Sequence, residues 1–214
     1  MALPANALTT VETVAAEVSG ISKDDTAAVE RLLGVASDAI ERFCNRSFCY
    51  AVVTDERYKA TDTHRLVLRR RPVLSIESIT VDGSVIDSAG YYIESAEAGI
   101  IWLDSSLVRY EYPPRGSMSQ DGVPGTDEAN VLVSYTGGYV TPAQETAELP
   151  RTIPYELEQA AIDTFASLWR RRGVDLRSGA FDGENTAIGR GIGGVIPGPV
   201  IPTLKRFQSW CGHG

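Results

Sequence analysis

Apolar residues near the start of the chain recur with helical spacing. The segment that begins at Ser22 and ends at Asn45 carries one apolar stripe with the spacing i, i+3, i+4, i+7, so it is predicted to be an amphipathic helix. The stripe consists of Val29, Leu32, Leu33, Ala36, Ile40 and Phe43. A shorter helix is expected before it, because Thr9-x-x-Glu12 fits a capping box and Gly20 is a typical helix end. Together they predict an αα-hairpin over residues 9–45.

The middle of the chain is rich in β-branched and aromatic residues in short runs. A β insertion is therefore expected over residues 48–139. Asp82-Gly83 lies between two of these runs and predicts a tight hairpin turn. The predicted strands lie at 48–58, 64–70, 74–81, 85–86, 91–93, 100–103 and 131–135. The loop at 104–130 is rich in proline and glycine, and a loop of that length is usually functional or disordered.

A further helix is predicted over residues 154–172. Pro154 suits its first turn, and Arg170, Arg171 and Arg172 place cations at the negative end of its dipole. The fold class is therefore α+β: a small antiparallel helical bundle, made of the N-terminal αα-hairpin and this C-terminal helix, with a β-strand insertion. We expect residues 1–182 to form the body of the protein.

Residues 183–214 are expected to form an extended, flexible C-terminal arm, because glycine and proline dominate residues 186–202. The arm is also too apolar to be a purely solvating tail. A flexible and apolar segment suggests ordering on a partner, with the three arginines at its root pairing with carboxylates of that partner. The predicted partner interface is Arg170, Arg171, Arg172, Ile192, Val195, Ile196, Val200, Ile201, Leu204, Phe207 and Trp210.

Charge is unevenly distributed over the 214 residues, whose formal net charge is −8. Residues 1–150 hold 12 Lys/Arg against 22 Asp/Glu, and residues 151–214 hold 8 against 6. The acidic part argues against tight non-specific clamping of DNA, because phosphate binding depends on lysine and arginine. No apolar run approaches the roughly 20 residues that span a bilayer, and no signal peptide is recognised, so we expect no membrane association.

Motifs for chemistry are sparse. Residues 189–194 match G-x-G-x-x-G, but they follow a polar stretch and run into Pro197-Gly198-Pro199, where the dinucleotide fingerprint needs a strand and a helix. His64 and His213, the two histidines, lack a neighbouring nucleophile motif. No catalytic, cofactor-binding or metal-binding residue is predicted, and no cofactor. The three cysteines, Cys44, Cys49 and Cys211, are expected to be reduced.

Three segments together resemble the head–tail connector (adaptor) family of tailed bacteriophages, typified by the HK97-like and SPP1-like connectors. The first is the αα-hairpin that ends in Ile40-Glu41-Arg42-Phe43-Cys44-Asn45-Arg46-Ser47-Phe48. The second runs from Leu66-Val67-Leu68-Arg69-Arg70-Arg71-Pro72-Val73 to Asp82-Gly83, and the third from Val131-Leu132-Val133-Ser134-Tyr135-Thr136-Gly137-Gly138-Tyr139 through Pro154 to Trp169-Arg170. The match covers roughly residues 8–172. The loop at 104–130 is longer than expected for a minimal member of this family, and the arm is also extended.

The resemblance implies a non-enzymatic structural subunit of the virion. It implies a dodecameric ring of identical subunits that docks beneath the portal protein, extends the DNA channel and meets a stopper or tail-completion protein. Double-stranded DNA would pass through the channel without sequence recognition. The expected location is the head–tail interface of the virion, with assembly in the host cytoplasm. The alternatives are another neck protein, such as a stopper or tail terminator, and a small carboxylate-based hydrolase.

Overall fold

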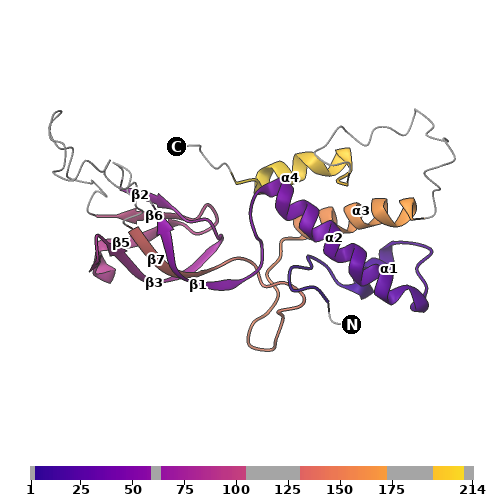
Figure 1. The fold of residues 1–214 in the computed structure, drawn as a ribbon, viewed down its shortest axis with the longest axis horizontal. Coiled ribbons are helices and arrows are strands. Elements are labelled where there is room, and N and C mark those ends of the chain that lie inside the picture. Colours follow the sequence, from indigo (N-terminus) through magenta and orange to yellow (C-terminus); the bar gives the residue numbers. More distant parts are fainter. Residues whose placement is uncertain (1–2, 59–63, 105–130, 173–194, 210–214) are drawn as a thin grey trace, which may run out of the picture. The chain divides into compact units, whose positions relative to one another are not determined.

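The computed structural model describes residues 3–58, 64–104, 131–172 and 195–209. The chain divides into two units (Figure 1). The first, here called the helical unit, combines Met1–Tyr50 with Tyr139–Gly214, and the second, the β unit, is Ala51–Gly138. The loop predicted at 104–130 lies outside the described residues except for Asp104, and so does the part of the predicted arm before Val195.

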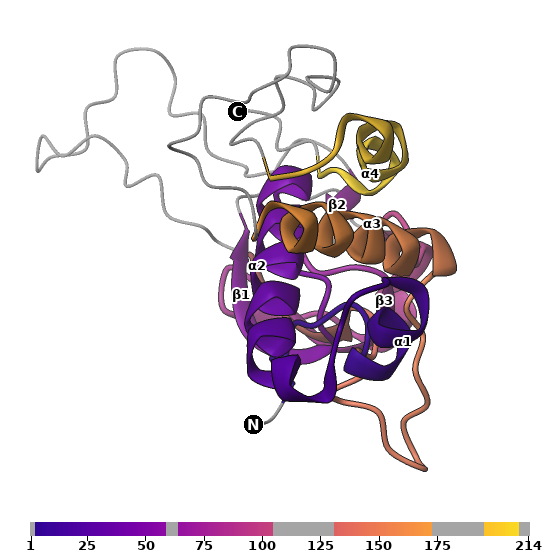
Figure 2. The ribbon, with the colours of Figure 1, turned by 90° about the vertical axis from the view of Figure 1, so that its right-hand side faces the viewer.

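Six helical segments form the helical unit within the described residues. They are α1 (Val11–Glu17), η1 (Lys23–Asp25), α2 (Thr26–Cys44), α3 (Tyr155–Arg171), η3 (Gly198–Val200) and α4 (Ile201–Phe207). The helices α2, α3 and α4 contact one another in all three pairs, as Figure 2 shows, and α1 packs on α2. This part of the chain therefore forms a shared core from segments that are far apart in the sequence.

The ends of α1 and α2 follow from local side-chain chemistry. Thr10 caps α1, because its hydroxyl accepts a hydrogen bond of 3.1 Å from the Thr13 amide. The predicted capping box at Thr9 is therefore wrong by one residue, and the Thr9 hydroxyl instead donates to Glu158 at 3.0 Å. Ser22 and Asp25 form a capping box before α2, and Asn45 ends α2 in the left-handed conformation with φ 51°.

Residues 195–209 were predicted to belong to an extended, flexible arm, but in the structure they pack on the helical unit. Ile196, Val200 and Leu204 are buried in the helical unit, where Ile201 and Phe207 pack against the same cluster. Val200 and Leu204 are four positions apart and share one face at the start of α4, whereas Ile196 lies two residues before η3. Pro202 lies in the first turn of α4, where its missing N–H costs no hydrogen bond.

The β unit contains two antiparallel sheets. The four-stranded sheet has the order β1 (Ala51–Tyr58), β7 (Val131–Gly137), β3 (Val73–Val81), β4 (Ser84–Val85), and the three-stranded sheet has the order β2 (Arg65–Val67), β6 (Ile100–Leu103), β5 (Tyr91–Ser95). The 3-10 turn η2 (Ser88–Gly90) precedes β5. One apolar cluster, which includes Ile79, Ile101 and Val133, draws residues from both sheets. The sheets thus bury a common core.

The predicted hairpin turn is confirmed at Asp82-Gly83, between β3 and β4. Both residues have positive φ, 49° and 80°, as the two central residues of a type I′ turn require. The predicted α+β class is also confirmed. The finer description as an antiparallel helical bundle is not, because strands are as prominent as helices and α4 joins the helical core.

Candidate interaction surfaces

The predicted interface residues lie in three different environments. Arg170, Arg171 and Arg172 are exposed at the C-terminal end of α3. Ile196, Val200 and Leu204 are core residues, whereas Val195, Ile201 and Phe207 are half-buried. Ile192 and Trp210 lie outside the described residues. Arg170 is therefore the described residue of the prediction that is exposed and for which no contact within the chain is described below.

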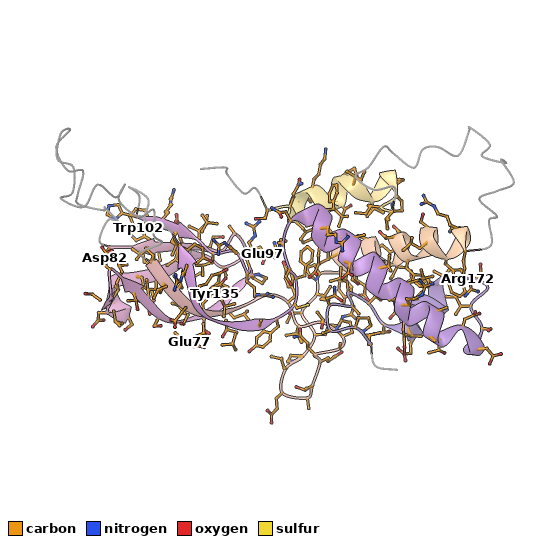
Figure 3. The ribbon with its side chains drawn as sticks, in the orientation of Figure 1. Glu77, Asp82, Glu97, Trp102, Tyr135 and Arg172 are labelled. Carbon is orange, nitrogen blue, oxygen red and sulfur yellow. The ribbon has the colours of Figure 1, made fainter. Side chains whose placement is uncertain are left out.

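Arg172 is held by the helical unit itself (Figure 3). Its Nη1 donates to Oδ1 of Asp25 at 3.0 Å, and its guanidinium carbon lies 3.8 Å from the centroid of the Trp169 ring. The amide and hydroxyl of Ser22 hold the pKa of the Asp25 carboxyl below its ordinary value, and Arg172 lowers that pKa further. Arg172 thus ties the end of α3 to the start of α2.

A groove of about 400 Å³ lies in the helical unit where α3 packs against η3 and α4. Its lining is Tyr155, Glu156, Gln159, Ala160, Asp163, Pro199, Val200 and Thr203. Tyr155 is 88% exposed, the most exposed of the large apolar or aromatic side chains in the described part of the chain. Glu156 accepts a hydrogen bond of 3.2 Å from Nη1 of Arg206, and the Gln159 amide donates to Asp163 at 3.2 Å. The groove combines an aromatic ring, a small apolar floor and two carboxylates.

A second surface lies on the three-stranded sheet of the β unit, around Trp102 (labelled in Figure 3). The His64 ring stacks on Trp102 with centroids 5.2 Å apart, and the Arg65 guanidinium carbon lies 5.6 Å from the Trp102 ring. Arg65 also makes two hydrogen bonds with Glu94, at 2.6 and 2.8 Å. Tyr92, which pairs with Trp102 across β5 and β6, is 54% exposed. This aromatic face was not predicted, because its members come from three strands.

Arg69-Arg70-Arg71, here called the first arginine triplet, has a structural role. Arg69 donates through Nη1 to Glu56 at 3.2 Å, and its guanidinium carbon lies 4.9 Å from the Tyr58 ring centroid. The guanidinium of Arg71 donates to the Ala98 carbonyl at 3.3 Å. These contacts hold the segment that joins β2 to β3.

Groups suited to chemistry are scarce in the described parts of the chain. No three His, Cys, Asp or Glu side chains gather there as metal ligands would. Burial raises the pKa of the Cys44 thiol to about 12, so this thiol stays protonated and unreactive at neutral pH. None of the described helices is both long enough and apolar enough to cross a bilayer.

The described surfaces of this α+β chain offer arginines and exposed aromatic rings, which are enriched at protein–protein interfaces. The family model of head completion proteins matches residues 7–207, so the chain belongs to the head completion protein family. No curated protein matches the sequence significantly.

Solved structures with a similar fold come from gene transfer agent (GTA) particles. A chain from the neck of an empty GTA particle, computed with C6 symmetry, has a TM-score of 0.50 at 16% identity, over 100% of this chain and 95% of that one. A chain from the neck of the native particle, computed with C12 symmetry, has a TM-score of 0.48 at 15% identity with the same coverage. A third comes from the native virion, with a TM-score of 0.49 at 17% identity and, again, the same coverage.

The family match defines a structural role in the head–tail neck of a phage or phage-like particle, as the resemblance of the three sequence segments implied.

Proposed function

We propose that the chain is the head–tail connector (adaptor) subunit that assembles into a ring beneath the portal, extends the DNA channel and joins the head to the tail. The observation that carries this proposal is the match to the head completion family over residues 7–207, which takes in both units. The neck proteins of similar fold come from particles analysed with C6 and C12 symmetry, which supports a ring of twelve identical subunits. The role requires no catalysis.

The partners proposed are further copies of the chain, the portal protein on the head side and a stopper or tail-completion protein on the tail side. The exposed Arg170 and the aromatic face around Trp102 are surfaces suited to protein contacts. DNA would pass through the ring without sequence recognition. The excess of acidic residues in 1–150 supports passage, since carboxylates repel phosphates. The proposed location is the head–tail interface of the virion, after assembly in the host cytoplasm.

The test is electron microscopy of the purified protein mixed with portal-bearing heads that lack it. We expect an added ring of density directly beneath the portal, with twelve-fold symmetry. Heads that lack the protein and receive an unrelated acidic protein of the same size serve as the control. Density that appears only after a separate connector has bound would identify a stopper instead. The absence of binding to heads in any order would refute the connector role.

A further inference from the structure

The exposed face of α3 separates acidic from basic residues. Glu156 and Asp163 are exposed in its first nine residues, and Arg170 is exposed in its last turn. Asp163 and Arg170 are seven residues apart, or about 10.5 Å along the helix axis, which is too far for an ion pair. The positions three and four residues after Asp163 are Ala166 and Ser167, so neither carries a charge. The two ends of α3 therefore do not neutralise each other along this face.

The helix dipole explains only part of this arrangement. A carboxylate in the first turn and arginines in the last turn are favoured by the dipole, and this accounts for Glu156, Arg170 and Arg171. Asp163 is the ninth of the 17 residues of α3, beyond the reach of the dipole at either end. Its carboxylate is held by Gln159 at the edge of the groove described above. Asp163 thus keeps an exposed negative charge beside a surface that is hollowed and partly apolar.

The groove suits one type of side chain. Its floor includes Ala160 and Val200, which are buried, and Tyr155 adds an exposed aromatic ring. An arginine has an apolar stem that packs on such a floor, and a planar cation that pairs with carboxylates and stacks on aromatic rings. Arg170 is such a residue on the same chain, at the far end of the same helix. Arg172 is not available, because Asp25 and Trp169 hold it.

We infer that the groove lined by Tyr155 and Asp163 receives Arg170 of a neighbouring copy of this chain. This inference rests on the proposed ring and names the surfaces through which adjacent subunits meet. A ring needs a heterologous interface, in which two different patches of one chain are complementary. The groove with Asp163 at its edge, and Arg170 in the last turn of α3, are two such patches. Each subunit would give its Arg170 to one neighbour and receive the Arg170 of the other.

Charge reversal tests the pairing. Asp163→Arg alone and Arg170→Asp alone each place like charges across every interface, so we expect at least a tenfold loss of ring-bearing heads. An equimolar mixture of the two variants should restore rings, because alternating subunits make every interface complementary in a ring of even number. Glu17→Arg, at the exposed end of α1, makes the same change in charge as Asp163→Arg and should leave rings unaffected. Rings that form normally with either single variant would overturn the inference.

Cross-linking separates a head-to-tail ring from other arrangements. The cross-linking variant keeps Asp163 and Arg170 and carries Thr203→Cys, in the groove lining, and Arg171→Cys, next to Arg170. It is assembled on portal-bearing heads and treated with a short bis-maleimide. We expect a ladder of covalent multimers that requires both substitutions, whereas the two single variants and the unaltered chain control for the native cysteines. Products that stop at a dimer would indicate two-fold pairing of α3 helices and overturn the inference. Cross-links to the portal alone would also overturn it. In both cases the ring itself would stand, whereas the loss of the ring in the unaltered protein would refute the proposed function.

Discussion

The hydroxyl of Tyr135 donates a hydrogen bond of 2.7 Å to Oε2 of Glu56, and so joins the central strand β7 to the edge strand β1 inside the β unit. Tyr58 donates to the same oxygen at 2.5 Å. The hydroxyl of Tyr135 in turn accepts a hydrogen bond from the Arg70 amide, and that of Tyr58 accepts one from the Arg69 amide, each at 3.0 Å. One carboxylate and two tyrosines therefore hold the backbone between β2 and β3, which carries the first arginine triplet.

Removal of the Tyr135 hydroxyl should destabilise the β unit. Tyr135→Phe keeps the fully buried ring but leaves the Arg70 amide without its acceptor and Glu56 with one donor fewer. We expect the free energy of unfolding to fall by about 1–3 kcal/mol, the usual cost of an unsatisfied buried group. Urea denaturation followed by circular dichroism measures the loss, and hydrogen exchange of the β7 amides assigns it to this unit. Tyr92→Phe, at an exposed position, is the matched control and should change little; an equal effect of both substitutions would contradict the network.

The same contact predicts how stability depends on alkaline pH. Burial, and then the hydrogen bond to Glu56, raise the pKa of Tyr135 from 10.0 to about 12. A raised pKa stabilises the fold fully below the unfolded value, and this contribution is lost as the pH rises from about 10 towards 12. The slope for one tyrosine is at most about 1.4 kcal/mol per pH unit. The gap in unfolding free energy between the wild type and Tyr135→Phe should stay constant from pH 7 to 9 and shrink above pH 10. A gap that widens above pH 10 would mean that folding lowers the pKa of Tyr135 instead of raising it.

Local patterns predicted the elements that depend on neighbours in the sequence. The stripe from Val29 to Ile40 predicted α2, and Asn45 and Asp82-Gly83 predicted a helix end and a turn, because each of these signals acts within a few residues. The segment that includes α4 was not predicted to fold onto the body, for the opposite reason. Its apolar spacing is present at Ile196, Val200 and Leu204, but the prolines around it are typical of an irregular segment, and burial against α2 and α3 decides the outcome.

The Glu56 network and the groove beside Asp163 were harder to predict, because both join residues far apart in the sequence. Glu56 and Tyr135 are 79 residues apart. A β-bulge between Val53 and Glu56, with Asp55 at φ 50°, shifts the alternation of β1 so that Glu56 and Tyr58 share the side of Val53. Strict alternation from Val53 would have placed Asp55 and Arg57 there. The groove beside Asp163 likewise depends on α4 folding back on α3.

The C-terminal helix α4 should be essential to the stability of the helical unit. Leu204 is fully buried in a cluster with Ile40, Phe48 and Leu157. Leu204→Ala removes three carbon atoms from this core, so we expect a loss of about 2–5 kcal/mol and faster proteolysis within residues 195–209. Thermal melts and limited proteolysis measure the two effects. Val85→Ala, at a side chain that is 72% exposed, is the control and should shift stability by less than about 0.5 kcal/mol. If Leu204→Ala were as stable as the control, 195–209 would not be part of the core.

The three arginines that end α3 should divide into a structural and an assembly group. Arg172→Ala removes the stacking on Trp169 and the ion pair with Asp25, and we expect the cation–π contact to contribute about 0.5–1 kcal/mol to the stability of the helical unit. Arg170→Ala should leave the melting temperature unchanged and lower the yield of ring-bearing heads. Asp25→Asn measures the contacts of this carboxylate with Ser22 and Arg172 together. Because the pKa of Asp25 is held below 3.8, its contribution is present at neutral pH and disappears as the pH falls through the folded value. The difference in melting temperature between the wild type and Asp25→Asn should therefore vanish in acid, while the effect of Arg170→Ala on assembly is read at neutral pH. A fall in stability with Arg170→Ala as large as that with Arg172→Ala would show that both arginines serve the fold, and the basic end of α3 would no longer be free to meet a neighbouring subunit.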